Sequence, residues 1–334
     1  MTSLQAVKRV DLTLTITHSY GARGGVEPKL ETKVIRARKG LSTTNVSFCI
    51  HNVTHCDLPW QIDWGRVLSM NEKVELYSSL FDRTELISLA NRLLDNDLKK
   101  VDMEQYLNPA SFPCVIWDIT DRQEILEKYL DSNERDSSIM PMYVRPTLEP
   151  VVAAKMFEDL KISVDILAKT FSTAKNPLKG KFLIFKTGWI NRFEPQADFR
   201  NLNNPLFEAW HAFLTYPYLD EESVRFLISE GVCGIGSDSI GLETPLFYVD
   251  PQSHNFQGYL RSISKIETQA PWGPVHLGFL AHKIFLLESL TNLEGVEMKA
   301  NELVNGTLFL FPLPLGVEDA VLERVFFEPE SHKL

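Results

Sequence analysis

Apolar and polar residues follow two different periods along this chain, and these periods predict a mixture of helices and strands. Over residues 84–96, leucines, an isoleucine and an alanine recur at helical spacing, with Asp82 or Thr84 as the cap. The same spacing predicts helices over residues 120–131, 148–170 and 221–229.

Short apolar runs bounded by polar or glycine residues predict strands. They cover residues 9–17, 33–38, 42–50, 113–118, 181–186, 232–236, 283–288, 305–312 and 321–327. Strands interspersed with helices indicate the α/β class. Because no internal repeat and no linker rich in small or polar residues divides the chain, we expect a single domain over residues 1–334.

The composition narrows the range of functions. With 334 residues, 44% of them hydrophobic, the chain can bury a large core. Its net charge of −10, without a basic cluster interleaved with aromatics, argues against nucleic-acid binding. No apolar run reaches about eighteen residues, so we expect no membrane span. A start without signal-peptide features, and four cysteines without Cys-x-x-Cys spacing, predict a cytoplasmic protein. These bulk properties agree with an enzyme whose partner is a small-molecule substrate.

The strongest candidate for chemistry begins at His51, where two imidazoles and a carboxylate lie within seven residues. His51, His55 and Asp57 are of the ligand types that divalent cations use. Extended backbone would hold the two histidines roughly 13 Å apart at about 3.3 Å per residue, so a shared cation requires a bend, for which Asn52 is suited. His55 and Asp57 face the same way on a strand, and Cys56 faces the opposite way.

A second set of metal-ligating residue types lies far along the chain. His276 follows Gly273 and Pro274, which are typical of a helix start, and Glu288 ends the apolar run 283–288. A carboxylate at the end of a buried strand is costly unless a cation or hydrogen bonds compensate it. Each residue alone is also compatible with an ordinary helix start or a strand end that faces water.

These residues resemble the motif His-x-Gly-Thr-His-x-Asp-x-Pro-x-His of the metal-dependent "putative cyclase" family, which includes bacterial kynurenine formamidases and isatin hydrolases. Further segments resemble that family in the same order, and the resemblance spans roughly residues 8–315. These segments are residues 10–13, 114–118, 185–189, 234–239 and 276–293, the last with His and Glu twelve positions apart.

The resemblance implies a mixed sheet curled into a barrel-like core with helices packed outside. It also implies a metal site in which His51, His55 and Asp57 are joined by His276 and Glu288. Such a site would be mononuclear or dinuclear, and its oxygen and nitrogen ligands fit Zn or Mn without separating them. Because members of the family commonly form dimers, the resemblance implies a homodimer.

Two segments, residues 119–180 and 244–273, are longer than in a typical bacterial hydrolase of the family. Insertions usually emerge at the surface, where they can cover a site or serve an interface. Trp60 and Trp64, with the aromatics of 244–273, are candidates to line a pocket for a flat or apolar substrate. Trp189 is a further substrate-binding candidate. The alternative is that these aromatics pack within the chain.

The chain departs from the family motif at two positions. The motif's glycine is Val53 here, and its final histidine, the proposed proton shuttle of the hydrolases, is Gln61. Glutamine does not titrate near neutral pH, but its amide can orient a water or hold a substrate carbonyl. Asp63 is a candidate for the missing base, and the alternative is an ordinary solvated loop acid.

Three functions are compatible with these residues. The first is a hydrolase that cleaves an amide, formamide, lactam or lactone with metal-activated water. The second is a non-hydrolytic cyclase or dehydratase of secondary metabolism, in which the metal is only a Lewis acid; the Gln61 substitution favours it because less proton transfer is needed. The third is a family member that keeps the fold without turnover.

Overall fold

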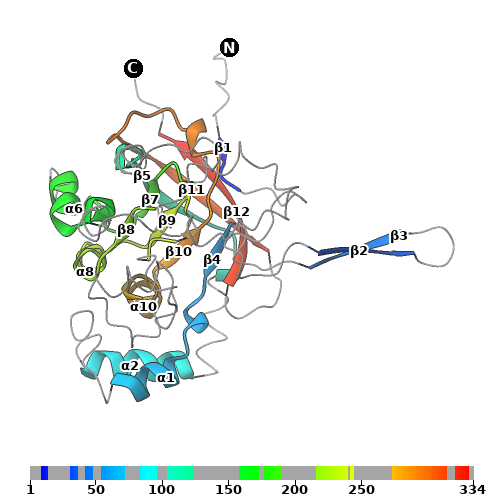
Figure 1. Ribbon diagram of the computed structural model, residues 1–334, viewed down its shortest axis with the longest axis horizontal. Coiled ribbons are helices and arrows are strands. Elements are labelled where there is room, and N and C mark those ends of the chain that lie inside the picture. The colour runs from blue at the N-terminus through cyan, green and yellow to red at the C-terminus, as the bar shows by residue number, and fades with distance from the viewer. Residues whose placement is uncertain are drawn as a thin grey trace, which may run out of the picture.

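A mixed sheet that closes on itself forms the centre of the protein (Figure 1). The structure, a computed structural model, describes residues 9–13, 31–36, 42–47, 54–71, 83–95, 104, 106–122, 158–172, 177–189, 216–239, 241–243, 273–313 and 320–330. The strands of the sheet lie in the order β1-β12-β11-β5-β7-β9-β10-β4, and β4 also pairs with β12. This last pairing closes seven of the eight strands into a barrel-like ring, and β1 pairs with the other end of β12, at Phe326 and Phe327.

The strands run in both directions around this ring. β5, β7, β9 and β10 are parallel to one another, whereas β4, β11 and β12 pair antiparallel with each of their neighbours in the ring. Their bounds are β1 Val10–Asp11, β4 His55–Asp57, β5 Ala110–Asp118, β7 Phe182–Lys186, β9 Gly234–Ser237, β10 Phe285–Glu288, β11 Leu303–Leu313 and β12 Ala320–Pro329. Two further pairs lie outside the ring, β2 (Glu31–Arg36) with β3 (Ser42–Ser47) and β6 (Lys161–Ile162) with β8 (Tyr218–Leu219).

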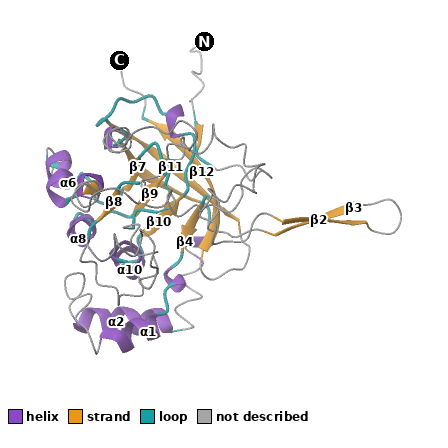
Figure 2. Cartoon of the chain, viewed as in Figure 1, coloured by secondary structure: helices purple, strands orange, loops and turns teal. Residues whose placement is uncertain are grey.

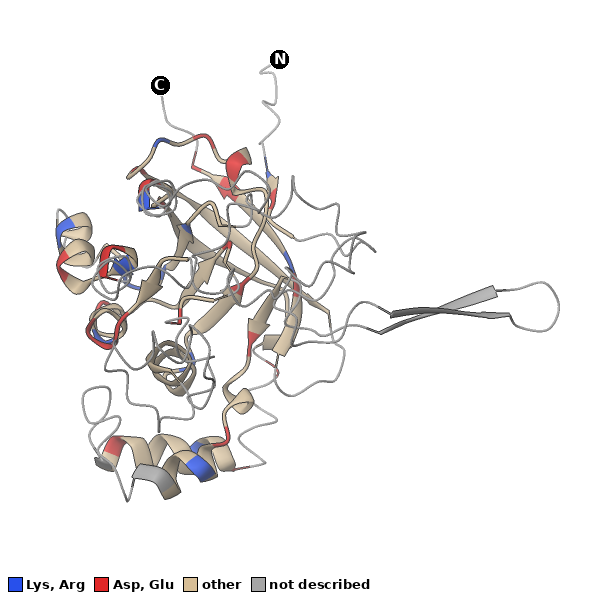
Figure 3. Cartoon of the chain, in the orientation of Figure 1, with Lys and Arg blue, Asp and Glu red and all other residues tan. Residues whose placement is uncertain are grey.

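Helices cover the outside of the sheet (Figure 2). α6 (Val164–Phe171), α8 (Glu221–Ser229) and α10 (Pro274–Ala281) lie in the connections between successive parallel strands, as parallel pairing requires. α1 (Trp64–Asn71) and α2 (Arg83–Leu94) follow β4 and pack on each other. Two 3-10 turns, η2 (Pro59–Gln61) and η5 (Leu293–Gly295), complete the described elements. Charged positions gather on the outer helices, as Figure 3 shows for α6 and α8.

Alternate residues of the strands enter two separate hydrophobic clusters. In β5, Val115 and Trp117 pack against the helices, whereas Cys114 and Ile116 face the barrel interior. The same alternation places Cys56 in the interior. This division between two buried faces explains why the parallel strands are almost continuously apolar in sequence.

The carboxyl ends of the parallel strands meet at one edge of the sheet, where polar residues are buried. Asp238 follows β9 and accepts hydrogen bonds from the backbone N–H (2.8 Å) and hydroxyl (2.6 Å) of Thr187 and from the N–H of Gly188 (2.8 Å). Burial raises the pKa of Asp238 to about 6, although these hydrogen bonds act to lower it. Asp118, which ends β5, contacts Lys186 Nζ at 2.8 Å. This edge is where α/β sheets commonly hold their sites.

The predicted fold class is confirmed, since a barrel-like mixed sheet with outer helices is what the structure contains. The helix predicted over 221–229 has those bounds, because Asp220 caps it by accepting the N–H of Ser223 at 2.9 Å. The helix predicted over 84–96 is α2. The strands predicted after residue 100 all form, with bounds that shift by a few residues.

The continuous helix predicted over residues 148–170 is wrong. Residues 158–160 are helical, but β6 then interrupts the helix by pairing with β8, and α6 begins only at Val164. Arg122 holds this break by donating to the carbonyl oxygens of Asp159 (3.0 Å) and Lys161 (2.7 Å). Tertiary pairing therefore overrides helical periodicity here. Most of the helix predicted over 120–131 lies outside the described residues.

Gly234 allows β9 to approach β7 closely, and this yields a prediction about stability. A Cβ at this position would lie 2.1 Å from the ring of Phe182, which is fully buried. We expect Gly234→Ala to lower the free energy of unfolding by about 2 kcal/mol, since the buried ring has to move. Urea denaturation measures this effect. Gly65→Ala, in an exposed position of α1, is the matched control and should be neutral or stabilising. An equal effect in both variants would contradict the close contact.

Candidate metal centre

The pairing of β4 with β10 brings three metal-ligating side chains together. Glu288 lies opposite His55, and Leu286 lies opposite Asp57, so the three polar side chains project from the same face of the two strands. His55 Nε2 is 3.2 Å from Asp57 Oδ1 and 3.6 Å from Glu288 Oε2. Possible ligand atoms of all three residues lie within 4.8 Å of one another. His55 and Asp57 are fully buried, and Glu288 nearly so.

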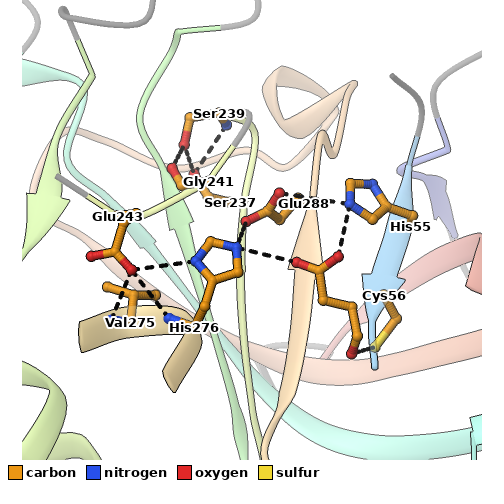
Figure 4. A network of polar contacts seen from close by, with 10 residues as sticks. His55, Cys56, Ser237, Ser239, Gly241, Glu243, Val275, His276 and Glu288 are labelled. Atoms are coloured by element: carbon orange, nitrogen blue, oxygen red, sulfur yellow. Dashed lines mark hydrogen bonds and ion pairs between the residues drawn. The ribbon is translucent and has the colours of Figure 1, made fainter. Parts of the chain in front are cut away.

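His276 joins this group from α10, which packs beside β10 (Figure 4). Its Nε2 is 3.4 Å from Asp57 Oδ2 and 3.5 Å from Glu288 Oε1. Each carboxylate therefore presents one oxygen to His55 and the other to His276. The cluster therefore contains two possible cation positions. At each of them one imidazole nitrogen lies near one oxygen of Asp57 and one oxygen of Glu288.

The donor set fits a divalent cation. Ligands at about 2.1 Å from a tetrahedral cation are about 3.4 Å from one another, and the nitrogen–oxygen separations here run from 3.2 to 3.6 Å. Glu288 Oε1 is buried without a hydrogen-bond partner in the described part of the chain. Two imidazoles and two carboxylates are ligands that Zn and Mn both accept.

The electrostatics of the group follow from its burial. Burial opposes the charge of His276, but its close contacts with the carboxylates of Asp57, Glu243 and Glu288 outweigh burial and hold the pKa of His276 well above its usual value. Burial and the nearby charge of Asp57 raise the pKa of Glu288. Without a cation, this cluster therefore holds protons that a bound metal would displace.

A sharp turn after β10 fixes the direction of Glu288. Ser289 has a φ of 59°, in the left-handed region that residues other than glycine rarely adopt. Its N–H donates to Ser239 O at 2.9 Å, and its carbonyl accepts the hydroxyl of Thr54 at 2.8 Å. The turn is thus held by hydrogen bonds to two other segments, the one that follows β9 and the one that leads into His55.

The structure brings together four of the five predicted ligands, His55, Asp57, His276 and Glu288. His51, the fifth, lies outside the described residues. The expectation that His55 and Asp57 share a face and Cys56 does not is confirmed by their contacts.

The two predicted catalytic residues have different surroundings. Gln61 ends η2, four residues after Asp57, and its Oε1 is buried without a hydrogen-bond partner among the described residues. Asp63 is exposed, and its Oδ1 accepts the N–H of Arg66 at 3.0 Å. This contact makes Asp63 a cap at the start of α1, in agreement with the alternative of a solvated acid.

The three predicted substrate-binding tryptophans are all held by contacts within the chain. Trp64 is 2% exposed and donates from its indole to Pro59 O at 2.7 Å, which assigns it to packing. Trp60 donates to Leu93 O at 3.2 Å. Trp189 packs edge-on against Tyr216, with ring centroids 6.2 Å apart, beyond the carboxyl end of β7.

Sequence reasoning missed two residues near the site. Glu243 contacts His276 Nδ1 at 3.3 Å, and the signal for it was an acidic residue five positions after Asp238. Tyr216 is fully buried, and its hydroxyl has no hydrogen-bond partner in the described residues. Burial, followed by the charges of Glu288 and Glu243, raises the pKa of Tyr216 well above its usual value. Its phenol therefore stays protonated and can donate a hydrogen bond.

A family model described as Putative cyclase matches residues 10–244, which include β4 and Glu243. No curated protein matches the chain. In the part of the chain that the structure describes, no helix is long and apolar enough to cross a membrane.

Solved structures share the fold at low sequence identity. Isatin hydrolase A from Ralstonia solanacearum is 18% identical, with a TM-score of 0.50, covering 96% of this chain and 91% of that one. Isatin hydrolase A from Labrenzia aggregata, bound to benzyl benzoate, is 17% identical, with a TM-score of 0.51 and coverages of 96% and 93%. A structure described as a novel cyclase is 12% identical, with a TM-score of 0.53 and coverages of 97% and 89%. At such identities the likeness establishes the fold alone.

Proposed function

The chain belongs to the Putative cyclase family, and we propose that it is an enzyme, a metal-dependent hydrolase of a C–N or C–O acyl bond. Its substrate class would be an amide, formamide, lactam or lactone. The observation that carries this proposal is the convergence of two imidazoles and two carboxylates from β4, β10 and α10 in one buried cluster.

His55, Asp57, His276 and Glu288 would hold the cation, and we include His51 from the sequence motif as a fifth ligand. Zn and Mn both suit these ligands, and one or two ions can be accommodated, because each carboxylate offers both of its oxygens. When bound, such a cation lowers the pKa of water toward neutrality and polarises a carbonyl oxygen.

The side chains around the cluster would bind and orient the substrate. Gln61 can accept a hydrogen bond at its buried Oε1 and donate from its amide nitrogen, so it can hold a water or a substrate carbonyl. The protonated phenol of Tyr216 is a second donor. Neither group acts as a base near neutral pH, and we do not assign that role to the capping residue Asp63. Trp189 would lie near the substrate through its contact with Tyr216.

The identity of Gln61 also supports a second candidate function, a non-hydrolytic cyclase or dehydratase. Such an enzyme would use the same cation as a Lewis acid on a dicarbonyl substrate. It would need less proton transfer from a fixed side chain, and Gln61 lacks a titratable group. A family member without turnover is the third possibility.

Metal analysis and a substrate panel test these functions. We expect the purified protein to contain Zn or Mn and to hydrolyse an aryl formamide, an isatin-type lactam or a lactone, with loss of activity after chelation and recovery after metal addition. Gln61→His should raise kcat, at most by the roughly 10²–10⁴-fold that a general acid or base supplies.

Each other outcome of this experiment has a defined meaning. Hydrolysis by Gln61→His but not by the parent would favour the non-hydrolytic enzyme. A metal-loaded protein that turns over none of a broad panel would favour the non-catalytic member. A purified protein that binds neither metal under any loading condition would overturn the proposal.

A homodimer and a cytoplasmic location remain predictions. The β2–β3 hairpin extends away from the barrel (Figure 1), and a two-stranded hairpin is marginally stable unless it packs against another surface. A second copy of the chain would provide such a surface, and sedimentation of the purified protein would detect the dimer.

A further inference from the structure

Glu243 contacts the start of α10 and the ring of His276 through a single oxygen (Figure 4). Its Oε2 accepts the backbone N–H groups of Val275 at 3.0 Å and His276 at 3.2 Å. The same oxygen is 3.3 Å from Nδ1 of His276. Glu243 is 1% exposed, so a buried carboxylate is committed to these contacts.

The local backbone is shaped around this carboxylate. Gly273, the residue that precedes α10, lies so close to Glu243 that a Cβ would fall 1.9 Å from the carboxyl carbon. Only glycine therefore leaves room for Glu243 to reach the first turn of the helix. The two residues come from segments separated by 244–272 in sequence, which indicates that the contact is built by the tertiary fold.

The two ring nitrogens of His276 face different partners. Nδ1 points to Glu243, while Nε2 points to Asp57 and Glu288. An imidazole that donates its Nδ1–H to a carboxylate keeps the lone pair on Nε2 and becomes a more basic ligand. The Nδ1 side of the ring thus contacts a carboxylate, and a carboxylate in this position prepares a histidine to bind a cation through Nε2.

We propose that Glu243 is a positioning residue that holds the ring of His276 with Nδ1 protonated and Nε2 directed at the metal position between Asp57 and Glu288. This inference rests on the metal centre of the proposed function. In this role Glu243 is not itself a ligand of the cation and acts through His276. A role limited to capping α10 would require only an acceptor for the two backbone N–H groups.

The experiment compares Zn²⁺ affinity, measured by competition with a chromophoric chelator, in four proteins: the parent, Glu243→Gln, His276→Ala and the double variant. Glutamine keeps the size of the side chain and an oxygen that accepts the backbone N–H groups, but it removes the negative charge. We expect Glu243→Gln to weaken Zn²⁺ binding roughly 10–100-fold, the usual effect of removing the partner of a ligating histidine. Glu222→Gln, an exposed position of α8, is the matched control and should change nothing.

The double variant separates positioning from a structural role. If Glu243 acts through His276, Glu243→Gln has no further effect on Zn²⁺ affinity once His276 is alanine. An equal loss in both backgrounds, or no loss in either, would overturn the proposal. Nitrogen NMR of the Zn²⁺-loaded, histidine-labelled parent should show Nε2 of His276 bound and Nδ1 protonated, and binding through Nδ1 would equally overturn it. A parent that binds no metal would instead overturn the metal centre itself.

Discussion

Replacing Asp57 with asparagine is expected to cause the largest loss of metal affinity of any single change in this protein. Asp57 presents Oδ1 to His55 at 3.2 Å and Oδ2 to His276 at 3.4 Å, so one carboxylate serves both imidazoles. Asparagine keeps the shape but replaces one oxygen with a nitrogen that cannot ligate. We expect the affinity to fall by more than about 100-fold, since loss of a group that only hydrogen-bonds to a ligand already costs roughly 10–100-fold.

Thermal unfolding with and without Zn²⁺ measures this loss independently of any substrate. A cation at 100 times its Kd stabilises a folded protein by about 2.7 kcal/mol. The parent should therefore unfold at a higher temperature with Zn²⁺ than without it, whereas Asp57→Asn should gain at most about 0.4 kcal/mol under the same conditions. Asp165→Asn, at an exposed position of α6, is the matched control and should respond like the parent. Equal stabilisation of the parent and Asp57→Asn would show that the cation binds elsewhere.

The second large effect is expected at Glu323, on the opposite side of the barrel wall from the metal centre. Glu323 lies on the same face of β12 as Val321, Val325 and Phe327, all of which belong to the interior cluster. It is 4% exposed, and its Oε2 has no hydrogen-bond partner in the described part of the chain. Burial raises the pKa of Glu323 to about 9.

This raised pKa makes stability depend on pH. The folded protein keeps a proton on Glu323 that the unfolded chain releases above about pH 4.5, so the contribution of this group to stability falls as pH rises from about 4.5 to about 9. The slope is about 1.4 kcal/mol per pH unit within that window, or roughly 3 kcal/mol by pH 7. Glu323→Gln carries no charge at any pH and should escape this loss.

Urea denaturation of the parent and Glu323→Gln from pH 5 to pH 9, with chelator present, measures the difference. The two proteins should be similar near pH 5, and the variant should be the more stable by an amount that grows toward pH 9. Glu294→Gln, at an exposed position, is the control and should follow the parent. Parallel curves for the parent and Glu323→Gln would mean that the carboxyl group titrates normally.

The candidate centre was partly predictable because one of its segments carries two ligands at short spacing and another ends an apolar run with a carboxylate. His55 and Asp57 share a strand face in any extended segment. A carboxylate such as Glu288 at the end of an apolar run indicates that a cation or hydrogen bonds compensate its burial. The residues that surround these ligands gave weaker signals. Glu243 follows a turn and reaches α10 only in the folded chain, and Tyr216 is an aromatic residue like any other until its hydroxyl is found buried.

Helix positions were predictable where the chain also carries local stop and start signals. α8 has its predicted bounds because Asp220 and the residues after it cap it within the sequence itself. The segment 158–171 carries a similar apolar period, but pairing of Ile162 with Leu219 breaks it into two. Periodicity reports which residues will be buried, and it does not report which partner will bury them.

The sequence by itself determined the alternation of strands and helices, which residues of β4 share a face, and the kinds of ligand available. These features depend on interactions between near neighbours in the chain. Only the tertiary structure decided that β4 closes the ring between β10 and β12, and that α10 directs His276 at a carboxylate more than 200 residues away in sequence. Closing the ring aligns distant segments to satisfy backbone hydrogen bonds and bury apolar faces, and such pairings leave no local pattern to read.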